Sequence, residues 1–96
     1  MNKIIKRDGR IVKFDRNKIF SAIFKAFASL DIDNEDLINN IVDEVIDRIN
    51  KKYNDKLPRV EDVQDEIEKV LIEHNEAEVA KAYILYRANR TRIRES

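Results

Sequence analysis

Cysteine and tryptophan are absent from the 96-residue sequence, and glycine, proline and histidine occur once each. Without cysteine there is no disulfide, no thiolate zinc site and no cysteine nucleophile. The single histidine, His74, excludes a metal cluster of several histidines. No apolar run approaches the roughly 20 residues of a membrane-spanning helix, and the N-terminus lacks a signal-peptide apolar region. We therefore expect a protein of the reducing cytoplasm with no membrane partner.

The scarcity of glycine also limits how a nucleotide can be bound. One glycine cannot supply either of the glycine-rich loops that hold phosphates in P-loop and dinucleotide-binding proteins. The sequence also lacks a Ser-His-Asp set, a Cys-His set and the HExxH zinc motif. No nucleophile or paired acid and base is evident, so we expect neither catalysis nor a metal site made of protein side chains. Any bound nucleotide must be held by basic side chains and hairpin backbone.

The charges balance overall but are segregated along the chain. Lysine plus arginine and aspartate plus glutamate each number 19. Residues 1–30 carry +6 (eight bases, two acids), residues 31–78 carry −10 (six and sixteen), and residues 79–96 carry +4 (five and one). If the basic ends meet in the fold, they form a positive surface on a neutral protein. Such a surface suits an anionic ligand better than nucleic acid, which favours a wider basic field.

The N-terminal segment, residues 2–14, is predicted as a β-hairpin. β-Branched residues flank Asp8-Gly9, and glycine tolerates the positive φ that tight hairpin turns need. A two-stranded hairpin is only marginally stable alone. The hairpin must therefore pack against helices.

Four helices are expected after the hairpin, at about residues 16–29, 35–53, 61–73 and 76–92. Apolar residues recur along them with the 3.6-residue period of a half-buried helix, and the last helix is expected to include Leu85 among them. Asp15 and Asn34 are suitable N-caps, and Pro58 disfavours helix at the residue before it. The expected fold is α+β and mostly α, with residues 1–96 forming one domain in which a hairpin packs on a four-helix bundle.

The predicted hairpin tip, Lys6-Arg7-Asp8-Gly9-Arg10, has two interpretations. Its charges can simply keep the edge of the hairpin soluble. Alternatively, Lys6 and Arg7 form a phosphate clamp, because arginine presents a planar fork and lysine a point charge to phosphate oxygens. Lys18 would add a third cation on the first turn of the next helix, where unpaired N–H groups also favour anions.

Arginines accumulate near the C-terminus, and their spacing places Arg87, Arg90 and Arg94 on one face of the last helix. One interpretation is that these are cations favoured near a helix C-terminus. The other is that this face lies beside the hairpin and completes the clamp. Tyr83 and Tyr86 are expected to be packed or half-buried residues, with a stacking surface for a base as the alternative.

Five segments of the sequence resemble the motifs of one known family. They are Ile4-Ile5-Lys6-Arg7-Asp8-Gly9-Arg10, Phe14-Asp15-Arg16-Asn17-Lys18-Ile19, Val60-Glu61-Asp62-Val63-Gln64, Ile67-Glu68-Lys69-Val70 and the stretch from Ala82 to Arg90. In this order and at this spacing they resemble the ATP-cone domain. This module is the regulatory nucleotide-binding domain at the N-terminus of many ribonucleotide reductases, and it also lies behind a zinc ribbon in the bacterial repressor of reductase genes. The resemblance covers about residues 3–92, and its Tyr-Arg ending is most like the anaerobic, glycyl-radical reductases.

The resemblance implies an allosteric switch in which bound ATP means active and bound dATP means inhibited, usually through changed subunit association. It also implies a set of nucleotide-binding residues. Those expected at the phosphates are Lys6, Arg7, Lys18 and Arg90, with Arg87 as a helper. Those expected at the sugar or phosphates are Val60 and Gln64. Those expected around the base are Ile4, Val12, Phe14, Asp15 and Ile19. The hairpin residues Ile5, Asp8 and Gly9 complete the expected set.

The expected partners are ATP or dATP accompanied by Mg²⁺, a reductase catalytic domain or subunit, and a further copy of the chain. A chain of 96 residues cannot hold the catalytic barrel of a reductase, so we expect an excised or free-standing cone without reductase activity. Two alternatives stay open. One is a nucleotide-responsive transcription-regulator module of the reductase-repressor type, disfavoured by the missing zinc-ribbon cysteines. The other is a helical association module without a working nucleotide site.

Overall fold

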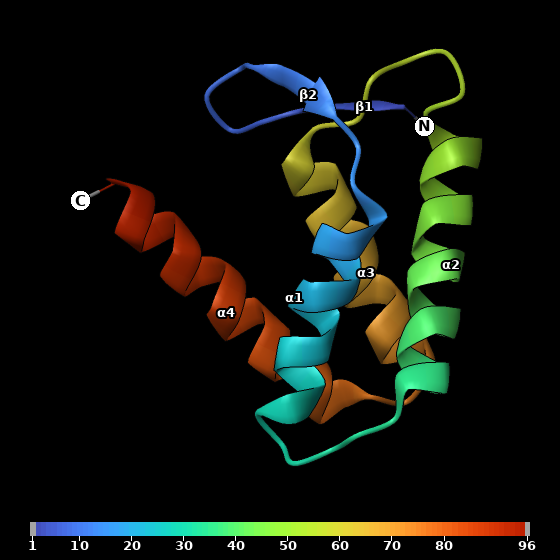
Figure 1. Ribbon diagram of the computed structural model, residues 1–96, viewed down its shortest axis with the longest axis vertical. Helices are drawn as coiled ribbons and strands as arrows, with labels where there is room; N and C mark the ends of the chain where they lie inside the picture. The colour runs from blue at the N-terminus through green and yellow to red at the C-terminus, as the bar shows by residue number, and fades with distance from the viewer. Residues whose placement is uncertain (1, 96) are drawn as a thin grey trace.

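The computed structural model describes residues 2–95, with side chains described for residues 2–90. Two short antiparallel strands precede the helices in the described part of the chain (Figure 1), which confirms the expected α+β class with a hairpin and four helices. None of the described helices is long and apolar enough to cross a membrane. The elements are β1 (Lys3–Ile5), β2 (Ile11–Lys13), α1 (Arg16–Ala28), α2 (Glu35–Lys52), α3 (Val60–Glu73) and α4 (Ala77–Glu95).

The hairpin turn is built around Gly9, which has a φ of +89°. The Lys6 N–H donates to the Arg10 carbonyl at 2.7 Å, and the Gly9 N–H donates to the Lys6 carbonyl at 2.9 Å. Three residues therefore lie between the paired positions, a loop length in which glycine commonly takes the left-handed position. Asp8 restrains the tip, because its carboxylate accepts hydrogen bonds from the backbone N–H of Arg10 at 3.0 Å and from the Arg10 side-chain Nε at 2.7 Å.

An extended segment just before α3 lies against β1, a pairing that the sequence pattern did not predict. The Ile5 N–H donates to the Pro58 carbonyl at 2.9 Å, and Ile5 forms an isolated parallel bridge with Arg59. Figure 1 shows β1 beside the connection that enters α3. The hairpin is thus fixed to the segment that enters α3, and this pairing places Lys6 and Arg7 at the same cavity as the start of that helix.

The helix ends follow local chemistry. Asp15 and Asn34 cap α1 and α2 as expected, each accepting a backbone N–H of the first turn. Asp31 and Asn75 have positive φ values of 59° and 61° beyond the ends of α1 and α3. Short polar side chains tolerate this conformation, so these positions end the helices and let the chain reverse.

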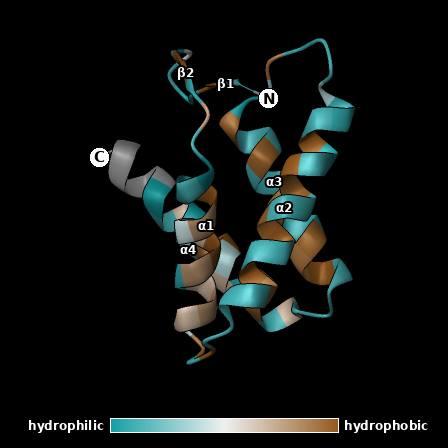
Figure 2. Cartoon of the chain, turned by 45° about the vertical axis from the view of Figure 1, so that its right-hand side comes forward, coloured by the Kyte–Doolittle hydropathy of each residue, from teal (hydrophilic) through white to brown (hydrophobic). Residues whose placement is uncertain are grey.

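The core lies between the four helices, where their apolar faces meet (Figure 2). The expectation for Leu85 is wrong, because its side chain is 70% exposed. Leu85 follows Tyr83 by two positions, which places it on nearly the opposite side of α4, whereas Tyr83 faces the core at 2% exposure. The buried apolar residues are Ile19, Ile23, Ala26, Phe27, Ile38, Ile41, Val42, Val45, Ile49, Val63, Ile67, Val70, Leu71, Val79, Ala80 and Tyr83.

A charged contact joins α2 to α3 outside this core. The two terminal guanidinium nitrogens of Arg48, Nη1 and Nη2, donate to the Glu73 carboxylate at 2.7 and 2.8 Å. Arg48 also lies 3.0 Å from a carboxylate oxygen of Glu44. The hydrogen bonds from Arg48 lower the pKa of the Glu73 carboxyl, so this contact favours the folded state when Glu73 is ionised.

Candidate functional site

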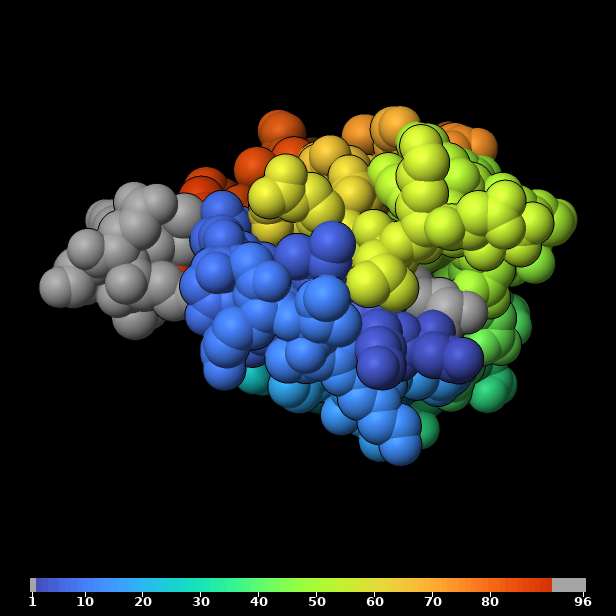
Figure 3. All heavy atoms as spheres, turned by 90° about the horizontal axis from the view of Figure 1, so that it is seen from above, coloured from blue at the N-terminus to red at the C-terminus, as the bar shows by residue number. Residues whose placement is uncertain are grey.

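A cavity of about 310 Å³ lies where the hairpin, α1, α3 and α4 meet. Residues from both basic ends of the chain line it, so the two ends meet as the charge pattern suggested. Figure 3 shows the hairpin lying over the helices and beside the start of α3. The predicted residues that line this cavity are Ile4, Lys6, Arg7, Val12, Phe14, Asp15, Lys18, Ile19, Val60, Gln64 and Arg90.

Three predicted hairpin residues are not among those lining the cavity. Ile5 follows Ile4 on β1, and successive side chains of a strand point to opposite faces. Its backbone N–H is also used in the bond to Pro58. Asp8 is engaged with Arg10 at the exposed tip, and Gly9 shapes the turn. These residues support the hairpin rather than the cavity wall.

Arg87, the expected helper, is directed at α3 instead of the cavity. Its Nη1 donates to Asp65 at 2.8 Å and to Glu68 at 2.9 Å. Those hydrogen bonds offset its desolvation, and the pKa of Arg87 is raised. Arg87 therefore joins α3 to α4 with its charge compensated. Arg94 lies outside the residues whose side chains are described.

The cavity also has lining residues that the sequence analysis missed. Lys25 is the most consequential, because it adds a cation from α1. Lys18, Ser21, Ala22 and Lys25 follow the spacing i, i+3, i+4, i+7, which places them on one helix face, and this spacing could have identified Lys25. Val63 and Ile67 of α3 are further additions. Tyr83 and Tyr86 of α4, which the sequence analysis considered as packed residues or as a stacking surface, also line the cavity.

Four of the cations that line the cavity are not paired with a carboxylate of the described residues. Among the residues with described side chains, Arg7, Lys18, Lys25 and Arg90 form no ion pair with a carboxylate. By contrast, the arginines that pair with carboxylates include Arg10, Arg16, Arg48 and Arg87, and the lysines include Lys51, Lys52 and Lys81. Arg7, Lys18, Lys25 and Arg90 therefore bring positive charge without a carboxylate partner in the described structure to one cavity. Other cations that form no ion pair among the described residues are Lys3, Lys13, Lys56, Arg59 and Lys69, and these do not line it.

Asp15 also lines the cavity, but its carboxylate caps α1 instead of pairing with these cations. Its carboxylate accepts the Asn17 N–H at 3.0 Å as the N-cap of α1. An N-cap carboxylate interacts with the positive end of the helix dipole. Asp15 is thus committed to the helix start, and none of the four uncompensated cations pairs with it in the described structure.

The deep part of the cavity is apolar, with one unsatisfied polar group. Ile19, Val63, Ile67 and Tyr83 are buried there, and burial raises the pKa of the Tyr83 hydroxyl, which stays protonated at neutral pH. The Oε1 atom of Gln64 is buried and has no hydrogen-bond partner among the described residues. An orphaned buried acceptor is costly, so this oxygen is suited to accept from a ligand.

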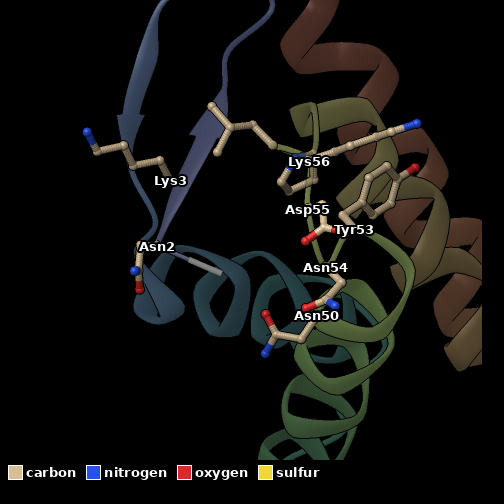
Figure 4. A pocket seen from close by; sticks show the side chains of 9 residues that line it. Asn2, Lys3, Asn50, Tyr53, Asn54, Asp55 and Lys56 are labelled. Carbon is tan, nitrogen blue, oxygen red and sulfur yellow. The ribbon is translucent and has the colours of Figure 1, made fainter.

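A second cavity, of about 580 Å³, lies on the other side of β1, between the N-terminal segment and the end of α2. Figure 4 shows the side chains of Lys3 and Lys56 extending away from each other, with Asp55, Asn54 and Asn50 below Lys56 in this view. These cations do not converge on a common point, so this cavity is poorly suited to a polyphosphate. Its lining residues are Asn2, Lys3, Asn50, Tyr53, Asn54, Asp55, Lys56, Leu57 and Pro58.

Comparison with known proteins agrees with this geometry. Residues 2–92 match the ATP cone domain family. The chain is 38% identical over 100 residues to a vitamin B12-dependent ribonucleoside-diphosphate reductase of Thermoplasma acidophilum, covering 99% of this chain and 13% of the relative. It is 35% identical over 102 residues to a ribonucleoside-diphosphate reductase subunit alpha of Chlamydia muridarum, covering 96% and 10%.

An anaerobic ribonucleoside-triphosphate reductase of Haemophilus influenzae is also similar, at 34% identity over 92 residues, which covers 96% of this chain and 13% of the relative. Relatives therefore come from reductases of several kinds at comparable identity. The chain spans about a tenth of the length of these curated relatives. With nearly all its residues matched by the family, the chain belongs to the ATP-cone domain family.

Proposed function

We propose that this chain is a regulatory domain that binds ATP or dATP in the 310 Å³ cavity and thereby controls the association of a ribonucleotide reductase. The observation that carries the proposal is the gathering of Arg7, Lys18, Lys25 and Arg90, uncompensated among the described side chains, around that cavity. A triphosphate supplies several negative charges in a compact space. It would supply the negative charge that no carboxylate of the described residues supplies to these four cations.

The phosphates would be held by three structural elements. Lys6 and Arg7 reach them from the hairpin, Lys18 from the first turn of α1, and Arg90 from α4. The two arginines can donate two parallel hydrogen bonds to phosphate oxygens, whereas the lysines act as point charges. The N-terminus of α1 adds the favourable end of a helix dipole.

The base and sugar would occupy the apolar part. Ile4 and Val12 are cross-strand partners on the hairpin and both line the cavity, as do Phe14 and Ile19. Their side chains can enclose a flat heteroaromatic ring. The orphaned oxygen of Gln64 would accept a hydrogen bond from a sugar hydroxyl or from the amino group of the base. Val60 contributes only apolar contact, because its side chain has no hydrogen-bonding group.

Magnesium fits this site as part of the nucleotide. No group of three or more histidine, cysteine, aspartate or glutamate side chains suited to a metal exists among the described residues. Mg²⁺ usually keeps several waters and binds through phosphates plus one or two carboxylates. The metal would therefore neutralise part of the triphosphate charge, while the protein cations bind the remaining oxygens.

Calorimetric titration with ATP, dATP and GTP tests the proposal. Charge-assisted contacts contribute about 1.5–3 kcal/mol each, and three or four of them support a Kd near 1 μM, or about −8 kcal/mol, after the cost of association. The double variant Lys6→Ala/Arg7→Ala should weaken ATP binding by more than about 100-fold, because two such contacts are lost.

The matched control is Lys51→Ala/Lys52→Ala, which removes two cations from α2. These lysines pair with Asp47 and Glu66 and do not line the cavity. ATP affinity should be unchanged in this control. Equal ATP affinities for the two double variants would contradict the site. Sedimentation with ATP and with dATP then tests whether the nucleotide changes association.

A further inference from the structure

Three side chains form an array along the cavity where α1 meets α4. The Nη1 of Arg90 donates to the hydroxyl oxygen of Tyr86 at 3.1 Å. The guanidinium carbon of Arg90 lies 5.9 Å from the centroid of the Tyr86 ring, and the Nζ of Lys25 lies 5.9 Å from the same centroid. Both distances are within the range of cation–π attraction. One tyrosine thus contacts a cation from each helix.

The Tyr86 contact restrains Arg90 without neutralising it. Arg90 is exposed and lies one helical turn beyond Tyr86, and a long arginine side chain has considerable rotamer entropy to lose when it binds. A hydroxyl accepts a hydrogen bond from the guanidinium but carries no formal charge. Arg87 shows the opposite arrangement, because its two acceptors on α3 are carboxylates. The positive charge of Arg90 is therefore not compensated by a carboxylate of the described residues and can act on a ligand.

Tyr86 is itself held against the core. Its ring centroid lies 6.3 Å from that of Tyr83, with the rings tilted by 38°. Tyr83 is only 2% exposed, so its position is set by packing. This contact gives Tyr86 a stable position from which its hydroxyl can orient Arg90. The same ring lies 5.9 Å from both Lys25 and Arg90, so two positive charges surround one tyrosine, an arrangement that favours an anion nearby.

We propose that Tyr86 is a positioning residue of the nucleotide site, which orients Arg90 toward a phosphate and holds Lys25 at the same anionic group. The inference rests on the function proposed above. It goes beyond that function by proposing that the neutral hydroxyl of Tyr86 sets the orientation of Arg90 on the α4 side of the site. Binding by a prearranged cation loses less conformational entropy than binding by a mobile one.

The variant Tyr86→Phe tests this role, because it removes the hydroxyl and keeps the ring. Calorimetry should show ATP binding weakened about fivefold, corresponding to one net hydrogen bond. Inorganic triphosphate should be weakened by a similar factor, since the effect acts on phosphate binding. In an Arg90→Ala background, Tyr86→Phe should cause no further loss of ATP affinity, which is the coupling that a double-mutant cycle measures.

The outcomes separate this inference from the proposed function. An equal loss from Tyr86→Phe in both backgrounds would overturn the positioning role, because the hydroxyl would then act on the ligand directly. A loss of ATP affinity in Arg90→Ala but not in Tyr86→Phe would overturn the positioning role while leaving the proposed nucleotide site intact. Failure of the unmodified chain to bind ATP would overturn both. The melting temperature of the ligand-free variants should be unchanged, which excludes a general structural effect.

Discussion

Gln64 gives a prediction in which stability and binding change in opposite directions. Its Oε1 atom is buried, lines the cavity and has no partner among the described residues. We predict that Gln64→Met stabilises the ligand-free domain and weakens ATP binding. Methionine has a similar length and no polar group that needs a partner, so it should fill the same space.

The magnitudes follow from the state of this oxygen. An unsatisfied buried polar group costs about 1–3 kcal/mol, and Gln64 is only half-buried as a whole, so the expected gain is about 1 kcal/mol. In a domain of this size that corresponds to roughly 4–8 °C in melting temperature. Loss of one hydrogen bond to the ligand, about 0.5–1.5 kcal/mol, should weaken ATP binding about 2- to 12-fold.

Urea unfolding and calorimetric titration measure the two effects. Glu61→Met is the control for binding, because Glu61 Oε1 is also buried without a partner among the described residues but Glu61 does not line the cavity. ATP affinity should be unchanged in that variant. A Gln64→Met protein that is less stable and binds ATP normally would refute the reasoning, since the amide would then serve the fold alone.

Three further predictions concern the fold. Because Arg48 lowers the pKa of the Glu73 carboxyl, the folded-state pKa lies below the unfolded value of about 4.5, so this contact stabilises the fold above that pH and is lost on acidification. Thermal stability should therefore fall more steeply below about pH 4.5 in the unmodified protein than in Glu73→Gln. Gly9→Ala should cost about 1 kcal/mol in urea unfolding, because φ is +89°, while no described residue other than the two neighbours in the chain lies within 4 Å of the added Cβ. Leu85→Ser should change the free energy of unfolding by less than about 0.5 kcal/mol, whereas Ile67→Ala should cost about 2–5 kcal/mol.

A specific result would contradict each of these three predictions. Parallel acid profiles for the unmodified protein and Glu73→Gln would show that the Arg48 contact does not favour folding. A Gly9→Ala protein as stable as the unmodified one would show that the turn adapts without strain. Comparable losses for Leu85→Ser and Ile67→Ala would show that Leu85 is packed in the core.

Local sequence signals account for most of the helical framework. Apolar periodicity located the helices, and Asp15 and Asn34 marked two of their starts, because a capping side chain acts on backbone within its own turn. The Asp8-Gly9 pair marked the hairpin turn, because the conformation of a tight turn depends on the residues within it. The C-terminal end of α4 differs most from the prediction, because that helix continues past residue 92 to Glu95.

Long-range pairing could not be predicted in the same way. The bond between Ile5 and Pro58 joins two segments that carry no local signal for each other. The difference between Arg87 and Arg90 also depends on tertiary structure, because only the packing of α4 against α3 brings carboxylates to Arg87. Leu85 was misplaced because α4 has a weaker apolar stripe than the other helices, and residue type alone suggested burial.

The central claim is that Arg7, Lys18, Lys25 and Arg90 converge on a triphosphate in the smaller cavity. An NMR titration of the labelled chain with ATP tests it most directly, by following the signals of every residue at once. The account predicts that the largest shifts fall on Lys6 and Arg7, the first turn of α1, Gln64 and Arg90, with little change around Asn50 and Asn54. Shifts concentrated at the end of α2, or no shifts at saturating ATP, would contradict it.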